Sequence, residues 1–246
     1  MQNGRGWGQD ATLSPGWAHL RDAAVRAVKA PEVWAPAITA GLLQIGGADE
    51  EISEWAVDET PIFGSNSDAK DASDVLVDVG SGLFIVSALA APSGDDTKQW
   101  FWSKTKGLAV GFGSLFITSN IPSPIKDGTK RERPNEKDDE SFPSGHAASA
   151  AVRYTLAYRN FSTHDMPDSA RTALRLSAVS LSLSTGWARV EAAEHYPADI
   201  LFGMALGHFI GSFMTDAFLG LEAGSDVSVA AVPEDGGMRL SLAARF

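Results

Sequence analysis

The residues Phe142-Pro143-Ser144-Gly145-His146 come directly before the alanine-rich run Ala147–Ala151, which we predict to be helical. A Ser-Gly pair that opens a helix leaves backbone N–H groups at the positive end of that helix, where they can hold a phosphate or another oxyanion. Gly145 lets a ligand approach the backbone closely, and His146 in the first turn can hand over a proton. The alternative is that Ser144 is an ordinary helix N-cap beside an incidental histidine.

A second candidate cluster lies further along the chain, in the segment Arg189–Asp199. Pro197 favours a helix that begins there, so His195 lies just before the helix and Asp199 in its first turn. This four-residue step is short enough for the carboxylate to hydrogen-bond one imidazole nitrogen and to raise the basicity of the other. Arg189 can clamp an anion beside it. An ordinary His–Asp pair at a helix start is the alternative.

Basic residues are scarce but concentrated. The chain has 20 Lys and Arg against 31 Asp and Glu, a net charge of −11, which argues against a nucleic-acid partner. Five basic residues nevertheless fall in the segment Ile121–Ser141, which we predict to be a long polar loop: Lys126, Lys130, Arg131, Arg133 and Lys137. This local cluster predicts an anion site, whereas a solvated loop balanced by its acidic neighbours is the alternative.

Length and composition narrow the fold class. With 246 residues, 44% of them hydrophobic, the chain fits one globular domain over 1–246 with its motifs within 126–199. It contains no cysteine, which excludes disulfides, thiolate metal sites and a cysteine nucleophile.

The apolar pattern predicts an all-α fold. We expect helices at about Trp17–Ala30, Trp34–Ile45, Glu50–Trp55, Val75–Ala91, Gln99–Thr118, Gly145–Asn160, Ser169–Thr185 and Pro197–Leu219. Residues Gly64–Lys70 read as a polar loop. The C-terminal segment 227–246 alternates about a turn at Pro233–Gly237, which indicates a small β-hairpin packed on the helices or a loose tail.

Three segments are apolar enough to raise the question of a membrane: Val75–Ala91, Leu108–Ile121 and Ile200–Leu221. Each is interrupted by polar residues or is short for a span, so we favour buried core helices of a soluble protein, with weakly hydrophobic spans or interfacial attachment as the alternatives. The N-terminus does not read as a signal peptide, which fits a cytoplasmic protein or a chain that follows a removed leader.

Taken together, the three clusters resemble a known signature. Lys126-x6-Arg133-Pro134, then Pro143-Ser144-Gly145-His146, then Arg189-x5-His195-x3-Asp199 resembles the three-part motif of the type-2 phosphatidic acid phosphatase superfamily, which includes bacterial acid phosphatases, lipid phosphate phosphatases and vanadium-dependent haloperoxidases. The resemblance spans Lys126–Asp199 and implies a helical bundle of the acid phosphatase/vanadium haloperoxidase type. The third motif usually begins Ser-Arg, and here Ala188 replaces the serine.

The resemblance also implies residue roles that agree with the chemistry above. His195 attacks phosphorus and forms a phosphohistidine, and Asp199 orients it. His146 protonates the leaving oxygen and then activates water. The remaining residues bind the phosphate oxygens: Lys126, Arg133, Ser144, Gly145 and Arg189. Three cations already supply the positive charge that a magnesium ion would bring, so no metal or other cofactor is expected.

The sequence therefore predicts a phosphatase for a phosphomonoester or a pyrophosphate, with a phosphorylated small molecule or lipid as substrate. The family suggests a site in the periplasm or at the outer face of a membrane. One alternative is a haloperoxidase that holds vanadate on His195 as a cofactor, where a phosphatase would meet vanadate as an inhibitor. Another is a non-catalytic protein that binds anions in the same pocket. The oligomeric state is left open.

Overall fold

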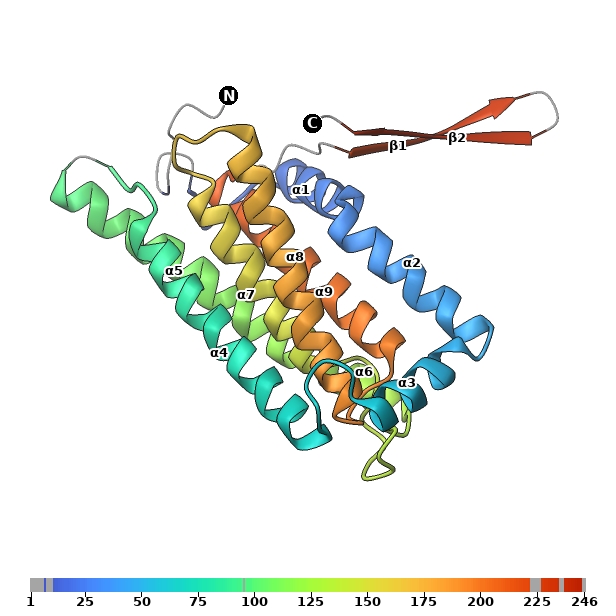
Figure 1. Cartoon of the computed structure of the whole chain (residues 1–246). Helices are drawn as coiled ribbons and strands as arrows, with labels where there is room; N and C mark the ends of the chain where they lie inside the picture. Colours follow the sequence, from blue (N-terminus) through green and yellow to red (C-terminus); the bar gives the residue numbers. More distant parts are fainter. Residues whose placement is uncertain (1–6, 8–10, 95, 222–226, 235–236, 245–246) are drawn as a thin grey trace.

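The computed structural model describes Trp7 and residues 11–94, 96–221, 227–234 and 237–244. Its body is a bundle of helices (Figure 1), which confirms the all-α prediction. The helices are α1 (Trp17–Lys29), α2 (Pro31–Ile45), α3 (Ala48–Glu59), α4 (Asn66–Ala90), α5 (Thr97–Asn120), α6 (Pro122–Thr129), α7 (Gly145–Phe161), α8 (Asp168–Glu191) and α9 (Pro197–Leu219).

The helices α7 and α9 form the centre of the bundle, and small residues allow their backbones to approach closely. Gly203, Gly207 and Gly211 recur every four residues on α9 and so share one face. A Cβ built on Gly203 would lie 2.5 Å from the carbonyl oxygen of Ser144, and one on Gly207 would lie 2.2 Å from that of Ala148. Only glycine fits at such distances, so this face of α9 holds the start of α7 beside the start of α9.

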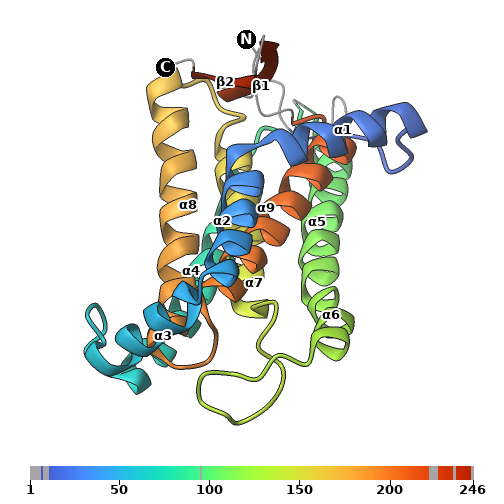
Figure 2. The ribbon, with the colours of Figure 1, turned by 90° about the vertical axis from the view of Figure 1, so that its right-hand side faces the viewer.

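The other helices surround this pair. Helices α4 and α8 pack against α7, α5 packs against α7 and α9, and α2 runs along α9. Figure 2 shows α5 and α8 on opposite sides of the bundle, with α1 crossing one end and the α6–α7 loop at the other. The loop therefore lies at the end where α7 and α9 begin and α8 finishes.

The helix boundaries confirm most of the predicted helices and correct two segments. Helix α9 has the predicted bounds, whereas the expected loop Gly64–Lys70 is helical from Asn66 onward. Ser65 caps this helix, because its hydroxyl oxygen accepts a hydrogen bond from the Asp68 N–H at 3.0 Å. The predicted loop Ile121–Ser141 begins with α6, where Pro122 occupies the first helical turn, a position that tolerates proline.

The C-terminal hairpin is present. Strand β1 (Val227–Glu234) pairs antiparallel with β2 (Gly237–Ala244), and Val227 lies opposite Ala244. Strand β1 includes Pro233 and Glu234, which the sequence assigned to the turn.

The bundle exposes a broad apolar surface. This corrects the prediction that the three apolar segments are buried core helices of a soluble protein. Among the described residues, three helical segments are long and apolar enough to cross a membrane: Asn66–Ala90, Thr97–Thr129 and Pro197–Leu219. The last is 67% buried over its most apolar part, as a core helix should be, but the first two are only 28% buried there. Large apolar side chains exposed on α4 and α5 include Val75, Val79, Val86, Leu89, Trp100, Phe101, Trp102, Phe112 and Phe116.

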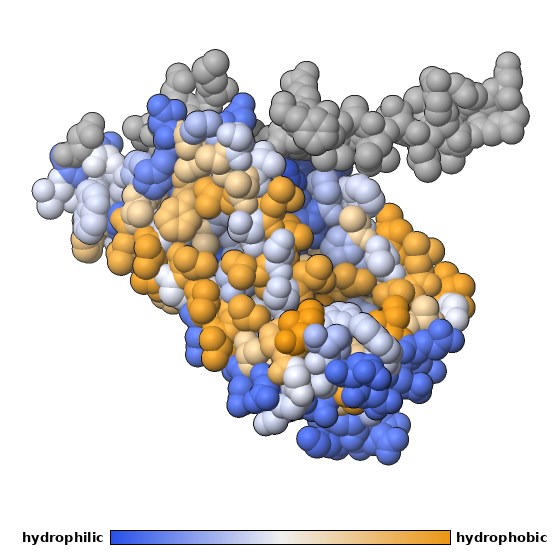
Figure 3. Space-filling model, in the orientation of Figure 1, coloured by the Kyte–Doolittle hydropathy of each residue, from blue (hydrophilic) through white to orange (hydrophobic). Residues whose placement is uncertain are grey.

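Figure 3 shows this apolar surface over the middle of the molecule, with hydrophilic residues gathered at the lower end, where Figure 1 places α3 and the α6–α7 loop. An apolar belt of this extent is typical of contact with lipid rather than with water. The protein is therefore membrane-associated.

Candidate active site

Backbone hydrogen bonds join the three sequence clusters at the hydrophilic end of the bundle. The Ser144 N–H, at the start of α7, donates to the Asp199 carbonyl oxygen in α9 at 3.1 Å. The Asn135 N–H, in the α6–α7 loop, donates to the carbonyl oxygen of Ala193, just after α8, also at 3.1 Å. The close packing of α7 on α9 thus brings together motifs that lie some 50 residues apart in sequence.

His195 occupies the centre of this site and is only 2% exposed. Its Nδ1 lies 2.7 Å from the carbonyl oxygen of Ser141. Because a carbonyl oxygen can only accept a hydrogen bond, Nδ1 carries the proton and the free lone pair is on Nε2. Ser141 therefore sets the imidazole in the tautomer that a nucleophile needs.

Burial and nearby positive charge keep this imidazole neutral. Burial is the largest cause that lowers the pKa of His195 well below its usual value, and the charges of Arg133 and Arg189 lower it further. Lys126 acts in the same direction, while the hydrogen bond to Ser141 opposes them. These charges show that the three predicted cations, from separate segments, lie around one histidine.

We predicted that Asp199 bonds to one imidazole nitrogen of His195. This is wrong for Nδ1, because Nδ1 bonds to the backbone carbonyl of Ser141. Asp199 instead accepts the Ser141 hydroxyl at Oδ2, at 2.6 Å, and the Tyr196 N–H at the same oxygen, at 3.0 Å. Its effect on His195 therefore passes through Ser141. The contact with the Tyr196 N–H is the usual one for a carboxylate in the first turn of a helix, where free N–H groups are available.

A buried ionic network continues from Asp199 and was not foreseen. Arg131 donates to Asp199 Oδ1 and to Asp49 Oδ2, both at 2.7 Å, and its guanidinium lies 4.2 Å from the ring centre of Tyr196. Asp49, only 2% exposed, also accepts the Ala198 N–H at 2.7 Å. The sequence analysis named Arg131 as a member of the basic cluster but assigned it no role. No feature of the local sequence indicated that Asp49 belongs to the site.

The two arginines share one carboxylate. Arg133 Nη1 donates to Glu194 Oε2 at 2.5 Å, and Arg189 Nη2 lies 3.2 Å from the same oxygen. The buried Nε of Arg189 has no hydrogen-bond partner, so one donor of this guanidinium remains for another acceptor. Lys126, from α6, lies 3.7 Å from a carboxylate oxygen of Glu140.

The start of α7 completes the site. Ser144 is fully buried and acts as the N-cap, since its hydroxyl oxygen accepts the Ala147 N–H at 3.3 Å. Ser144 is therefore a helix N-cap, and its hydroxyl proton can still donate to a ligand. A Cβ built on Gly145 would meet nothing within 4 Å, so packing within the protein does not explain this glycine.

His146 lies at the edge of the site, with its side chain 42% exposed. Its Nε2 is 3.1 Å from Oδ1 of Asp74, a residue of α4 that the sequence did not single out. Burial and the positive charge of Arg189 lower the pKa of His146, and Asp74 opposes them. Asp74 therefore helps to keep a proton on this imidazole.

Two further predictions concern the alanine at the start of the third motif and the absence of a metal site. Ala188, in place of the usual serine, is fully buried within α8. Within the part of the chain that the structure describes, no three His, Asp or Glu side chains gather so as to hold a metal ion.

Comparisons with known proteins agree with this geometry. The family model of the PAP2 superfamily matches residues 107–220, a range that contains all the predicted site residues. No curated protein matches the chain. One solved structure, described as the first transmembrane PAP2 type phosphatidylglycerolphosphate phosphatase from Bacillus subtilis, matches with a TM-score of 0.54 and 21% identity, over 76% of this chain and 94% of that one. The segment that contains these residues is thus similar to the PAP2 superfamily, and the fold of the chain is similar to that of a PAP2-type enzyme.

Proposed function

We propose that this protein is a metal-independent phosphatase that hydrolyses a phosphomonoester or a pyrophosphate bond through a phosphohistidine intermediate. The observation that carries the proposal is His195, whose Nδ1 bonds to the Ser141 carbonyl and whose pKa is lowered by burial and by three surrounding cations. A neutral imidazole with its lone pair on Nε2, inside a ring of positive charge, suits attack on a phosphorus atom that carries negative oxygens.

In the first step, Nε2 of His195 attacks phosphorus and the bond to the leaving oxygen breaks. Arg133, Arg189 and Lys126 bind the equatorial oxygens, whose charge is spread widely in the transition state. The unpartnered Nε of Arg189 offers a donor for one of them. The Ser144 hydroxyl and the Gly145 N–H add neutral donors at the positive end of α7.

His146 serves both steps. It donates its proton to the leaving oxygen, and the neutral imidazole then takes a proton from the water that attacks the phosphohistidine. Asp199 acts as a positioning residue, because its carboxylate holds the Ser141 hydroxyl and so fixes the carbonyl on which His195 rests.

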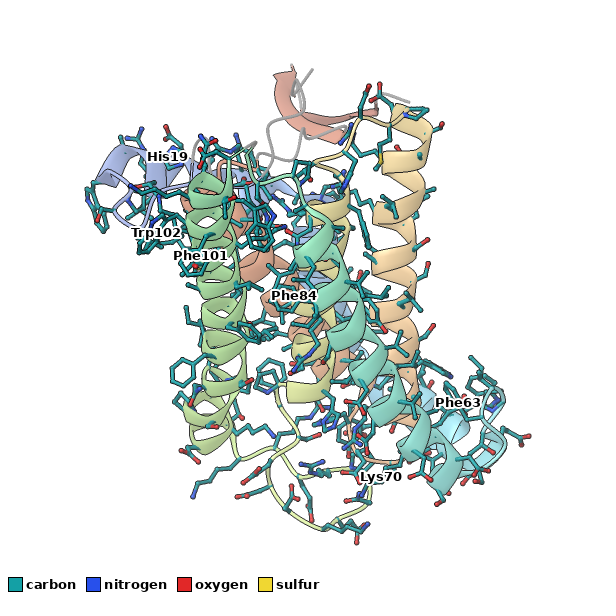
Figure 4. The ribbon with its side chains drawn as sticks, turned by 90° about the vertical axis from the view of Figure 1, so that its left-hand side faces the viewer. His19, Phe63, Lys70, Phe84, Phe101 and Trp102 are labelled. Atoms are coloured by element: carbon teal, nitrogen blue, oxygen red, sulfur yellow. The ribbon has the colours of Figure 1, made fainter. Side chains whose placement is uncertain are left out.

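The surroundings of the site favour a lipid phosphate as substrate. Helix α4 has 25 residues, or about 37 Å at ~1.5 Å per residue, enough to span the hydrocarbon core of a bilayer. Figure 4 shows Lys70 at the site end of the bundle and the aromatic residues Phe101 and Trp102 toward the other end, and aromatic residues of this kind gather at membrane interfaces. The site then lies at the opposite interface, within reach of a lipid headgroup, and we place it on the periplasmic or outer face.

A substrate panel tests this function. The detergent-solubilised protein, with a metal chelator in the buffer, is given phosphatidate, phosphatidylglycerophosphate, polyprenyl diphosphate and a soluble sugar phosphate, and phosphate release is measured. We expect release from at least one of the three lipids and little from the sugar phosphate. Release from none of them, together with bromide oxidation by peroxide after vanadate loading, would support the haloperoxidase instead.

The Asp74 contact predicts a change in the pH dependence. His146 must be protonated to act as an acid, so this contribution to kcat/KM is present below its pKa and lost as pH rises through it. Since the pKa is already lowered, we expect the basic limb of the wild-type profile below about pH 6.5. Asp74→Asn removes a charge that raises this pKa, so the limb should move to lower pH.

A profile of kcat/KM against pH for the wild type and Asp74→Asn measures this shift. Asp78→Asn, on the same helix, is the control that removes an equal charge, and its profile should match the wild type. A basic limb that stays in place in Asp74→Asn would show that His146 is not the acid.

A further inference from the structure

The function proposed above makes no use of Glu194, although its carboxylate lies among the cations of the site. Oε2 accepts from Arg133 Nη1 at 2.5 Å and lies 3.2 Å from Arg189 Nη2, while Oε1 lies 3.3 Å from Lys70 Nζ. The side chain is only 10% exposed. Three cations from three different segments thus meet at one carboxylate, directly before the nucleophile in sequence.

The backbone of Glu194 is also held in place. Its N–H donates to the Arg189 carbonyl oxygen at 3.1 Å, and its own carbonyl oxygen accepts from Arg133 Nη1 at 3.3 Å. Ala193, just before it, has a φ of +56°, a left-handed conformation that turns the chain after α8. The position of the carboxylate is therefore set by the fold and not by a free side chain.

This carboxylate contacts the same guanidinium groups that the proposed reaction assigns to the phosphate. Burial opposes its ionisation, but the positive charges of Arg189, Lys70 and Arg133 outweigh burial and lower the pKa of Glu194. It therefore carries a negative charge at neutral pH. A carboxylate and a phosphate both bind a guanidinium through paired oxygens, so the two anions compete for Arg133 and Arg189.

The competition has a structural reason. Without a nearby anion, the largely buried guanidinium groups of Arg133 and Arg189 would repel one another, which is costly. Arg133 is also held by Asp138, which accepts from its Nε at 2.6 Å, so this guanidinium cannot simply turn away. Glu194 balances the charge of the free enzyme and keeps both guanidinium groups near the place where the phosphate binds.

We propose that Glu194 is the resting counter-anion of the phosphate site: it holds Arg133 and Arg189 in the free enzyme, gives them up to the phosphoryl group, and takes them back as phosphate leaves. The inference rests on the proposed function and adds a role for Glu194 in the same site. Its consequence is that Glu194 weakens the binding of the product, inorganic phosphate, and so favours product release.

The test is the affinity for inorganic phosphate, measured by titration calorimetry on the full chain in detergent. Glu194→Gln keeps the shape of the side chain and removes its charge, so we expect phosphate to bind about tenfold more tightly, which corresponds to ~1.4 kcal/mol. The matched control is Glu54→Gln, an equal change of charge at an exposed position of α3, which should bind phosphate as the wild type does.

Steady-state kinetics provide a second readout. In Glu194→Gln, the inhibition constant of phosphate and the KM of the substrate should both fall, whereas a purely structural role would leave the arginines misplaced and raise both. Glu194→Asp keeps the charge on a shorter side chain and should show a smaller fall. Thermal unfolding of each variant identifies any that fail to fold, and if Glu194→Gln does so, Glu194→Asp carries the test.

The outcomes separate this inference from the proposed function. If the wild type releases phosphate from substrates but Glu194→Gln binds phosphate no more tightly, the counter-anion role is wrong and the function stands. If no substrate is hydrolysed and yet the variant binds phosphate more tightly, the counter-anion role stands and the function is wrong. If none of the proteins binds phosphate, the counter-anion role is wrong, and the function is wrong as well only if no substrate is hydrolysed.

Discussion

Replacing His195 by alanine should abolish turnover, with a fall in kcat of roughly 10⁴-fold or more, because the proposed mechanism assigns the attack on phosphorus to Nε2 of His195. The measurement is steady-state phosphate release from the best substrate of the panel. Labelled substrate adds a second readout, because the wild type should form a phosphoenzyme that is labile in acid and stable in base, as a phosphorus–nitrogen bond is, and the variant should form none.

His195→Ala leaves Lys126, Arg133 and Arg189 in place, so the variant should still bind inorganic phosphate. Retained phosphate binding separates the loss of a nucleophile from the loss of the fold. His164→Ala is the matched control, because the Nδ1 of His164 bonds to the Phe161 carbonyl at the end of α7 away from the site. Undiminished phosphate release from His195→Ala would defeat the phosphohistidine mechanism.

Replacing His146 by alanine should give the second largest loss, about 10²–10⁴-fold in kcat for a substrate with an alcohol leaving group. An alkoxide leaves poorly unless it is protonated, and His146 is the group placed to supply that proton. For p-nitrophenyl phosphate the first step should be far less affected, because nitrophenolate leaves without a proton.

The two substrates together give this prediction its control. With p-nitrophenyl phosphate, His146→Ala should show a burst of nitrophenolate followed by slow turnover, because His146 also activates the water of the second step. An equal loss on both substrates, without a burst, would mean that His146 contributes to binding and transfers no proton.

The fold was predictable wherever a segment carries its own boundary signal. Pro197 marks the start of α9, and the Ser144-Gly145 pair marks the start of α7. Helix α4 was predicted too short because its first turn is polar, although Ser65 and Asp68 form a local cap that could have revealed it. Apolar character alone did not separate lipid-facing helices from core helices, since both avoid water.

The order and spacing of short motifs were enough to single out Lys126, Arg133, His146, Arg189 and His195 as candidate site residues. How the fold holds these residues could be seen only once the helices were packed. The Ser141 carbonyl reaches His195 across 54 positions, and Asp49 reaches Ala198 across 149. Hydrogen bonds of this kind depend on how α7, α8 and α9 pack, and a local pattern of side chains does not record which distant carbonyl or carboxylate that packing brings near. For the same reason, the contacts of Glu194 with Arg133 and Arg189 became apparent only in the folded chain, although Glu194 directly precedes His195 in the sequence.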